Sequence, residues 1–305
     1  MDILNLIQVQ ITEIRQNNPP DYLDAILVHL ERAYLYYEKG SNDSYYYNDV
    51  VYRTNQAYEG SLREAYKVLY NKTSDQVAKK SPYEIEVYLK TDSVFKGRVI
   101  QLFENYRHEW RNQSAHDYKL IIDSNEAFLA LINVSAFVHL LLKLIQERIA
   151  YKQELAKDYT KNNLYQFANI SHAKGELVPS VLNLLRLFKQ EYLKNTDYKE
   201  VDLLGKLNAY LEKTIDVKIQ RELLLQAGTS IMRPDFIISN NIETAIIEVK
   251  RYRENRPIDP AINQLTSYLE AADLQYGILF LLNNEIYECV REVKMNDNLY
   301  KIYIV

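Results

Sequence analysis

Two acidic residues and a lysine in the last third of the chain have the spacing of a metal-dependent hydrolytic site. Glu248 follows Asp235 by thirteen residues, and Lys250 stands two residues further on. Asn240 and Asn241 favour a turn between them, so the segment predicts a β-hairpin with Glu248 and Lys250 on one strand face. Carboxylates bind hard cations, which lower the pKa of a coordinated water, and a lysine can orient that water or offset charge on a phosphate. The three residues therefore predict phosphodiester hydrolysis with Mg²⁺ or Mn²⁺.

The acid-x-Lys pattern is weak by itself, because the chain contains it five times, at 117–119, 197–199, 216–218, 248–250 and 292–294. Context separates these copies. The copy at 248–250 has an apolar run leading directly into it and a Pro-Asp pair at hairpin distance upstream. The copy at 292–294 has no such partner, and we expect it to be a solvated strand end.

The segments 233–238 and 245–252 resemble the PD-(D/E)xK nuclease superfamily, which includes restriction endonucleases and RecB-like nucleases. Gln264 and Tyr268, four residues apart on a predicted helix, resemble the Gln-x-x-x-Tyr element of the RecB-like branch. The resemblance covers the last third of the chain and implies a DNA-cleaving enzyme with a restriction-endonuclease-like fold. It also implies another acid ahead of the hairpin, for which Glu212 and Glu222 are the alternatives.

Arg251, Arg253 and Arg256 follow the trio and are candidates for binding phosphates, with an ordinary solvated loop as the alternative. The formal net charge of −4 means that nucleic acid must be bound by local basic patches, because the field of the whole chain does not attract it.

A second chemical signal lies in the first half of the chain, where Arg111, Asn112 and His116 end a predicted helix. This segment and the apolar helix after it resemble the HEPN family of helical bundles. The resemblance implies a metal-independent ribonuclease, in which His116 handles the proton of the RNA 2′-hydroxyl and Arg111 stabilises the phosphate charge. It also implies a homodimer that brings two copies of the motif together. The alternative is a structural Arg and His that hold a helix end.

The elements that would position these residues differ between the two halves. Residues 1–158 read as helices, with breaks at 17–20 and 40–42 and a polar loop at 71–82, and form the HEPN-like domain. Residues 159–198 read as a helical connector in which Pro179 suits a first helical turn. Residues 199–305 form the nuclease-like α/β domain, with short β-rich runs and a helix at 260–272. The predicted class is therefore α+β in two domains, an all-α bundle and a mixed sheet with helices.

One apolar segment, 127–145, is long enough to cross a bilayer. Ser135, His139, Lys143 and Glu147 recur every four residues and predict a polar stripe along a helix. We therefore expect residues 127–145 to form a core helix of a soluble bundle, with one edge of the helix exposed to water. Asp123 and Glu126 have the spacing of a capping box at its start.

The remaining composition favours a cytoplasmic protein without a membrane span. The single cysteine excludes an intramolecular disulfide, and the first residues lack the pattern of a signal peptide. The 27 tyrosines are interpreted as half-buried helix-packing residues, with a base-stacking or partner surface as the alternative.

Together these patterns predict a metal-dependent DNA nuclease joined to an HEPN-like dimerisation or ribonuclease domain, with DNA and RNA as candidate partners. By analogy of fold alone, the pairing suggests prokaryotic defence against phage or foreign DNA. The alternatives are a catalytically degenerate nucleic-acid-binding or assembly module, or an HEPN ribonuclease toxin whose second domain only binds nucleic acid.

Overall fold

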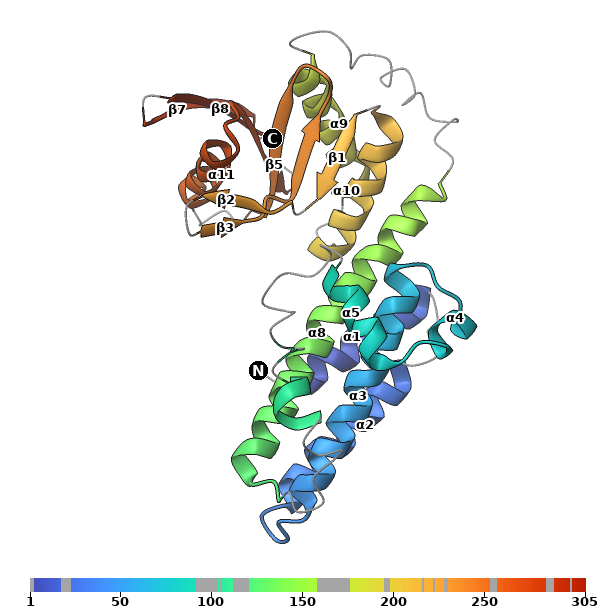
Figure 1. Ribbon diagram of the computed structural model, residues 1–305. Helices are drawn as coiled ribbons and strands as arrows, with labels where there is room; N and C mark the ends of the chain where they lie inside the picture. The colour runs from blue at the N-terminus through green and yellow to red at the C-terminus, as the bar shows by residue number, and fades with distance from the viewer. Residues whose placement is uncertain are drawn as a thin grey trace. The chain divides into compact units, whose positions relative to one another are not determined.

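The structure, a computed structural model, has the predicted α+β composition (Figure 1). The residues that it describes are 3–17, 23–91, 102, 104, 106–111, 121–157, 176–194, 198–215, 217–221, 223–227, 230–252, 257–283, 288–296 and 298–305. The chain divides into two compact units, Met1–Ile149 and Ala150–Val305.

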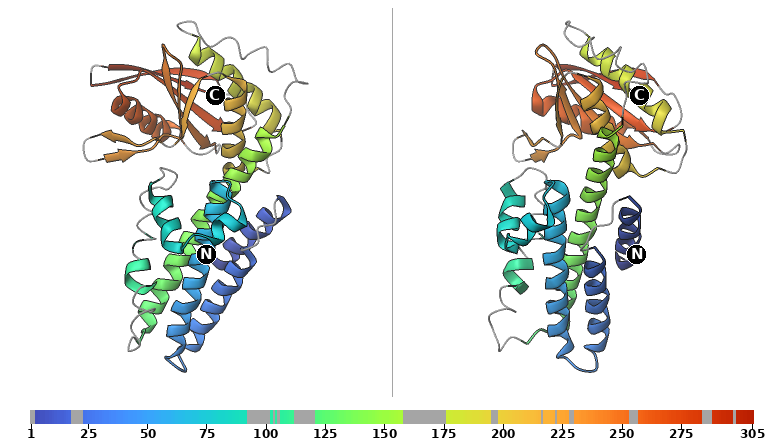
Figure 2. Two further views of the ribbon diagram at one scale, coloured as in Figure 1. Left: turned by 45° about the vertical axis from the view of Figure 1, so that its right-hand side comes forward. Right: turned by 90° about the vertical axis from the view of Figure 1, so that its right-hand side faces the viewer.

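The first unit is helical throughout its described residues. Its elements are α1 (Ile3–Asn17), α2 (Leu23–Lys39), α3 (Tyr46–Leu69), α4 (Ser74–Ala78), α5 (Pro82–Thr91), the π-helical turn η1 (Arg107–Arg111) and α8 (Ser124–Leu155), which continues into the second unit. The long helices α2, α3 and α8 run side by side (Figures 1 and 2). Between α2 and α3, Gly40 allows a close approach, because a Cβ there would lie 2.1 Å from the Tyr47 ring. The segment 71–82, predicted to be a loop, contains the short helix α4. A capping box formed by Thr73 and Gln76 lies at the start of this helix.

Aromatic side chains from different helices meet in the core of this unit. The Tyr58 ring lies 5.0 Å from that of Tyr106 and 5.5 Å from that of Phe137, and all three side chains are buried. The Tyr106 hydroxyl is 3.0 Å from Thr54 Oγ1, so its polar end is hydrogen-bonded. Tyr106 therefore packs helices together with its hydroxyl group hydrogen-bonded, and both tyrosines are fully buried rather than half-buried as predicted.

The capping box at the start of α8 is confirmed. Asp123 Oδ1 accepts from the backbone N–H groups of Asn125 at 2.8 Å and Glu126 at 2.9 Å, and Glu126 Oε2 accepts from the Asp123 N–H at 3.0 Å. The carboxylates also lie at the positive end of the helix dipole. The sequence thus determines where this helix begins.

The wetted edge predicted for α8 is only partly present. Ser135 is buried, and His139 Nδ1 lies 2.9 Å from Gln10 Oε1 on α1, while Lys143 is exposed. The stripe is partly covered because α1 packs against it through polar side chains. Among the described helices, α8 alone is long and apolar enough to cross a bilayer by length and composition, and half of its most apolar stretch is buried within the protein.

Replacing Asp123 with alanine should destabilise the chain by about 1 kcal/mol, because two N–H groups at the start of α8 lose their acceptor. Urea unfolding followed by circular dichroism measures the change. Glu126→Gln is the control, because its side chain still offers an oxygen to the Asp123 N–H. Equal midpoints for Asp123→Ala and the unmodified protein would contradict the capping role.

The second unit combines the end of α8 with two further helices, a sheet and a helix on its other face. Its elements are α9 (Leu177–Tyr192), α10 (Glu200–Thr214), β1 (Lys218–Arg221), β2 (Leu225–Ala227), β3 (Ser230–Met232), β4 (Phe236–Ser239), β5 (Thr244–Arg251), α11 (Asp259–Ala272), β6 (Tyr276–Leu282), β7 (Cys289–Met295) and β8 (Asn298–Ile304). The six-stranded sheet has the order β1-β4-β5-β6-β8-β7. Strands β5, β6 and β8 are parallel, and the other pairings are antiparallel.

Helices cover both faces of the sheet (Figure 2). On one face, α9 and α10 pack on alternate residues of β4, β5 and β6, with Phe188 and Phe280 in the core. On the other, α11 packs on the intervening residues, among them Ile246 and Leu279. A Cβ at Gly277 would lie 3.0 Å from Leu265, so this glycine lets α11 lie close to β6. Helix α9, from the segment expected to be a connector, therefore contributes to the core of this unit.

Strands β3 and β4 are separated by residues 233–235, which include Pro234, whose nitrogen cannot donate to a ladder. One strand prediction needs correction. The copy of acid-x-Lys at Glu292 and Lys294 is not a strand end but lies within β7, an edge strand paired with β8. It is largely solvated as expected, and Glu292 Oε1 is 3.6 Å from Lys301 Nζ.

Candidate active site

The β4–β5 hairpin brings Asp235 beside Glu248, as the spacing predicts. Phe236 is the register partner of Ile247, and the pairing continues to the turn after Ser239. Asn240 holds the turn, because its Oδ1 accepts from the backbone N–H groups of residues 242 and 243 at 2.9 and 2.6 Å. Asp235, one residue before β4, therefore lies at the same end of the hairpin as Glu248.

Hydrogen bonds connect the three residues of the trio. The Val249 N–H donates to Asp235 Oδ2 at 2.8 Å, and the Asp235 N–H lies 3.4 Å from Glu248 Oε2. Lys250 Nζ donates to Glu248 Oε1 at 2.6 Å. Glu248 is 3 % exposed and Lys250 is 37 % exposed, so the site has a buried carboxylate and an accessible ammonium.

Burial and a like charge change the acidity of this site. Burial, followed by the negative charge of Glu248, raises the pKa of Asp235 to about 7, against the opposing effects of the Val249 N–H, Lys250 and Arg221. Burial alone would lower the pKa of Lys250, but its hydrogen bond to Glu248 and the charges of both acids raise it above the ordinary value. The site therefore holds two carboxyl groups whose repulsion one ammonium only partly offsets.

Helix α11 brings Gln264 and Tyr268 to the same site. Gln264 Nε2 donates to the Tyr268 hydroxyl. Burial raises the pKa of Tyr268; the hydrogen bond from Gln264 lowers it, and the nearby charges of Glu248 and Lys250 act in opposite directions. The tyrosine thus lies within electrostatic reach of the trio. The four-residue spacing predicted a shared helix face, and the packing of α11 on the sheet turns that face toward Glu248.

Arg251, one of the predicted phosphate-binding arginines, does not lie beside the trio. It is next to Lys250 on β5, so it is on the opposite face, and its guanidinium is 5.7 Å from the Tyr198 ring centroid. Arg253 and Arg256 lie outside the described residues. Arg221, at the end of β1, is a basic neighbour of Asp235 that sequence reasoning missed. Arg221 lies near Asp235 because β1 pairs with β4, and this pairing is known only from the order of the strands in the sheet.

The structure does not bring the first alternative for the additional acid to the trio. Glu212 is exposed on α10 and accepts from the Tyr151 hydroxyl at 2.5 Å. The other alternative, Glu222, lies outside the described residues. Its neighbour Arg221 is the register partner of Phe236, which is next to Asp235.

The donor chemistry fits a hard divalent cation. Within the described ranges, no group of three or more His, Cys, Asp or Glu side chains could hold a metal ion, so the donors available there are the carboxylates of Asp235 and Glu248. Mg²⁺ commonly uses one or two carboxylates and keeps several waters. A cation beside this pair would also relieve the repulsion that raises the pKa of Asp235.

The HEPN-like motif falls at the edge of the described chain. Arg111 ends η1, and Asn112 and His116 lie outside the described residues. The neighbouring Trp110 is buried, with its ring 6.0 Å from that of Tyr106, so η1 is anchored in the bundle core. His108 is exposed beside Glu109, and His139 Nδ1 lies 2.9 Å from Gln10 Oε1.

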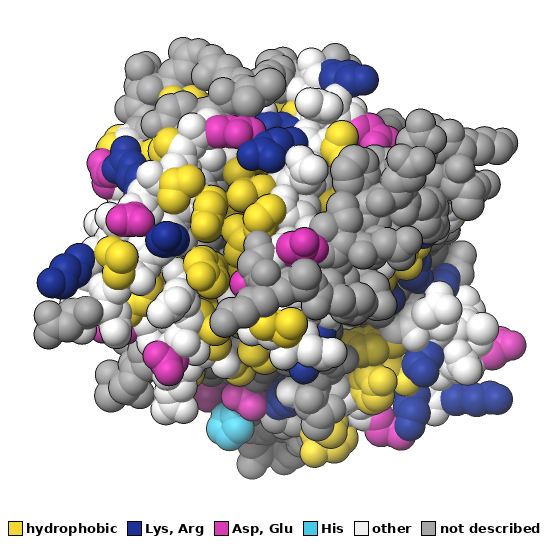
Figure 3. Space-filling model, turned by 90° about the horizontal axis from the view of Figure 1, so that it is seen from above, with side chains coloured by type: hydrophobic (Ala, Val, Ile, Leu, Met, Phe, Trp, Pro, Cys, Tyr) yellow, Lys and Arg dark blue, Asp and Glu magenta, His cyan; other side chains and the backbone are white. Residues whose placement is uncertain are grey.

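Comparison of the chain with protein-family models, with curated proteins and with solved structures finds no match. The candidate site is therefore defined by its own geometry. On the face seen in Figure 3, basic and acidic side chains are interspersed among the described residues, in keeping with the small net charge. Any nucleic acid would have to be bound by individual basic side chains near the site rather than by a broad basic field.

Proposed function

We propose that the second unit is a metal-dependent nuclease of the PD-(D/E)xK type. The observation that carries the proposal is the convergence of Asp235, Glu248 and Lys250 at one end of the β4–β5 hairpin, with the pKa of Asp235 raised to about 7. A purely structural Glu–Lys pair on a strand would need no second carboxyl group beside it. Strongly shifted acidities of this kind are frequent at catalytic and metal sites.

Each residue has a role that follows from its contacts. Asp235 and Glu248 would hold the cation, and the Val249 N–H orients the Asp235 carboxylate. Lys250 stays protonated and, being accessible, can contact a scissile phosphate or an attacking water. Tyr268 and Gln264 would position Lys250 and Glu248 from the α11 side. Bound Mg²⁺ or Mn²⁺ would supply an acidified water and offset negative charge on the phosphate.

The substrate class follows from the same chemistry. Two carboxylates without a cation repel a phosphodiester, so a divalent ion must be present before nucleic acid enters the site. Arg221 adds positive charge next to Asp235. We propose DNA as the substrate, in agreement with the resemblance to restriction endonucleases and RecB-like nucleases.

The full-length chain should cut DNA in Mg²⁺ or Mn²⁺ and lose this activity in excess EDTA. Supercoiled, linear duplex and single-stranded DNA and a matched RNA, resolved on gels, would test the proposal and identify the substrate form. Activity that persists unchanged in EDTA would contradict it. Binding of nucleic acid without any cleavage in either metal would favour the binding or assembly module.

The HEPN-like motif makes a separable prediction within the same assay. RNA cleavage by His116 would survive EDTA, because no metal takes part in the proton transfer. It should disappear in His116→Ala while DNA cleavage is retained.

A further inference from the structure

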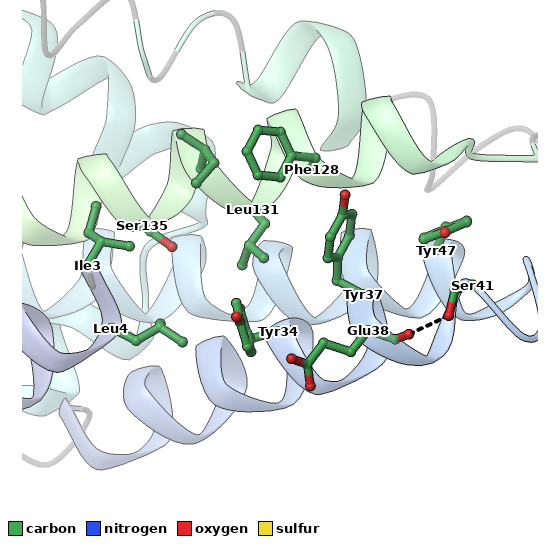
Figure 4. A pocket seen from close by; sticks show the side chains of 11 residues that line it. Ile3, Leu4, Tyr34, Tyr37, Glu38, Ser41, Tyr47, Phe128, Leu131 and Ser135 are labelled. Carbon is green, nitrogen blue, oxygen red and sulfur yellow. Dashed lines mark hydrogen bonds between the residues drawn. The ribbon is translucent and has the colours of Figure 1, made fainter. Parts of the chain in front are cut away.

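The helical unit contains a pocket that the proposed nuclease chemistry does not use. It has a volume of about 800 Å³ and is formed by α1, α2, α3 and α8 (Figure 4). Its described lining residues are Ile3, Leu4, Tyr34, Tyr37, Glu38, Ser41, Tyr47, Phe128, Leu131, Ile132 and Ser135. Pockets of roughly 300–1,000 Å³ are the size that encloses small organic molecules.

Aromatic rings from three helices form one wall of the pocket. The Tyr37 ring lies 5.9 Å from that of Tyr47 and 5.8 Å from that of Phe128. Figure 4 shows Tyr37 rising from α2 toward Phe128 on α8. Leu4 and Leu131 add aliphatic surface beside the aromatic wall. The wall suits a flat or aliphatic group, which would bury apolar area against it.

The hydroxyl of Ser135 does not face the pocket, although the residue is part of the lining. Its side chain is 1 % exposed and its Oγ is buried, so a molecule in the pocket would meet the aromatic and aliphatic side chains instead.

The charge of the lining determines which ligands are favoured. Glu38 is the only charged residue in the described part of the lining, and no lysine or arginine accompanies it there. Glu38 and Tyr34, one helical turn apart on α2, are both exposed and therefore lie toward solvent. A carboxylate beside tyrosine rings attracts an organic cation through charge and cation–π contacts and disfavours phosphates and carboxylates.

We propose that this pocket binds a small amphipathic organic cation. Its ammonium group would lie near Glu38 and Tyr34, and its apolar body would lie against Tyr37, Phe128 and Leu131. The activity of the second unit does not enter this argument, so the pocket and the nuclease site are tested separately.

Calorimetric titration of the full chain with 4-phenylbutylamine, 4-phenylbutan-1-ol and 4-phenylbutyrate tests the proposal, because the three probes share a body and differ in head-group charge. The amine should bind most tightly and the carboxylate most weakly. Glu38→Gln should weaken amine binding about fivefold and leave alcohol binding unchanged, as expected for a partly exposed ion pair. The matched control is Glu31→Gln, an exposed glutamate on the same helix that does not line the pocket.

A variant that fills the pocket tests whether the probes bind there rather than at another surface. Ile132 is 40 % exposed and lines the pocket, so Ile132→Trp should block it without enlarging a buried core residue. Loss of amine and alcohol binding in this variant, with unchanged circular dichroism, supports the proposal. The proposal is overturned if no probe binds saturably, if amine and carboxylate bind equally, or if Ile132→Trp binds as well as the unmodified chain.

Discussion

Asp235→Asn is expected to reduce metal-dependent DNA cleavage by about 10²–10³-fold, because the amide removes one of the two charged donors for the cation. The hydrogen bond from the Val249 N–H can be kept by the amide oxygen, so the hairpin should stay intact. Initial rates on a defined DNA substrate, measured over a range of Mg²⁺ and Mn²⁺ concentrations, give the size of the loss.

Lys250→Ala should cause a loss of similar size through a different step, because it removes the accessible ammonium and leaves both carboxylates. The chain contains a matched control. Lys294 ends an identical Glu-Val-Lys sequence on β7, and Lys294 is exposed there. The Lys294→Ala variant should cleave DNA at the same rate as the unmodified chain. The assignment fails if Asp235→Asn and Lys250→Ala remain active, or if Lys294→Ala loses as much activity as Lys250→Ala.

The same two positions should have opposite effects on the stability of the metal-free protein. Near neutral pH, ionised Asp235 is unfavourable because it is half-buried beside the buried carboxylate of Glu248. Asp235→Asn removes that charge and should raise the free energy of unfolding by roughly 1–2 kcal/mol, or about 2–8 °C in Tm. Lys250→Met should lower the free energy of unfolding by about 1–3 kcal/mol, since it leaves the buried Glu248 without its cation.

The pH dependence follows from the direction of the pKa shift. Because the pKa of Asp235 is higher in the folded than in the unfolded chain, the folded state binds more protons between about pH 4 and pH 7. The stability contributed by this group is therefore present below pH 4 and is lost as the pH rises through 7. Thermal unfolding in EDTA should show that the advantage of Asp235→Asn over the unmodified chain is larger at pH 8 than at pH 5.

Added Mn²⁺ should reverse the order of these stabilities, because a cation that binds only the folded state stabilises it by mass action. The unmodified chain should gain in Tm at pH 8, and Asp235→Asn should gain less. An advantage of Asp235→Asn that is the same at pH 5 and pH 8, or an equal response of both chains to Mn²⁺, would contradict the charged carboxyl pair.

Features that depend on near neighbours along the chain could be predicted from the amino-acid sequence. The capping box of Asp123 and Glu126, the Asn240 turn and the alternation along β5 are each set within a few residues, so their spacing predicts the local structure. Through the hairpin, the same local rules also determined that Asp235 meets Glu248. They could not give the acidity of Asp235, which depends on how deeply the finished fold buries it.

The distant residues that join the trio depend on how the helices and strands of the second unit pack together. Tyr268 reaches it because α11 packs closely on β6 at Gly277, and Arg221 because β1 pairs with β4. Arg251, although adjacent to Lys250, is directed to the other face of the sheet. The packing of α9 into the core and the pocket among four helices were likewise absent from the sequence pattern. Periodicity shows which face of an element is apolar, whereas the partner of that face is decided by how all the faces pack together.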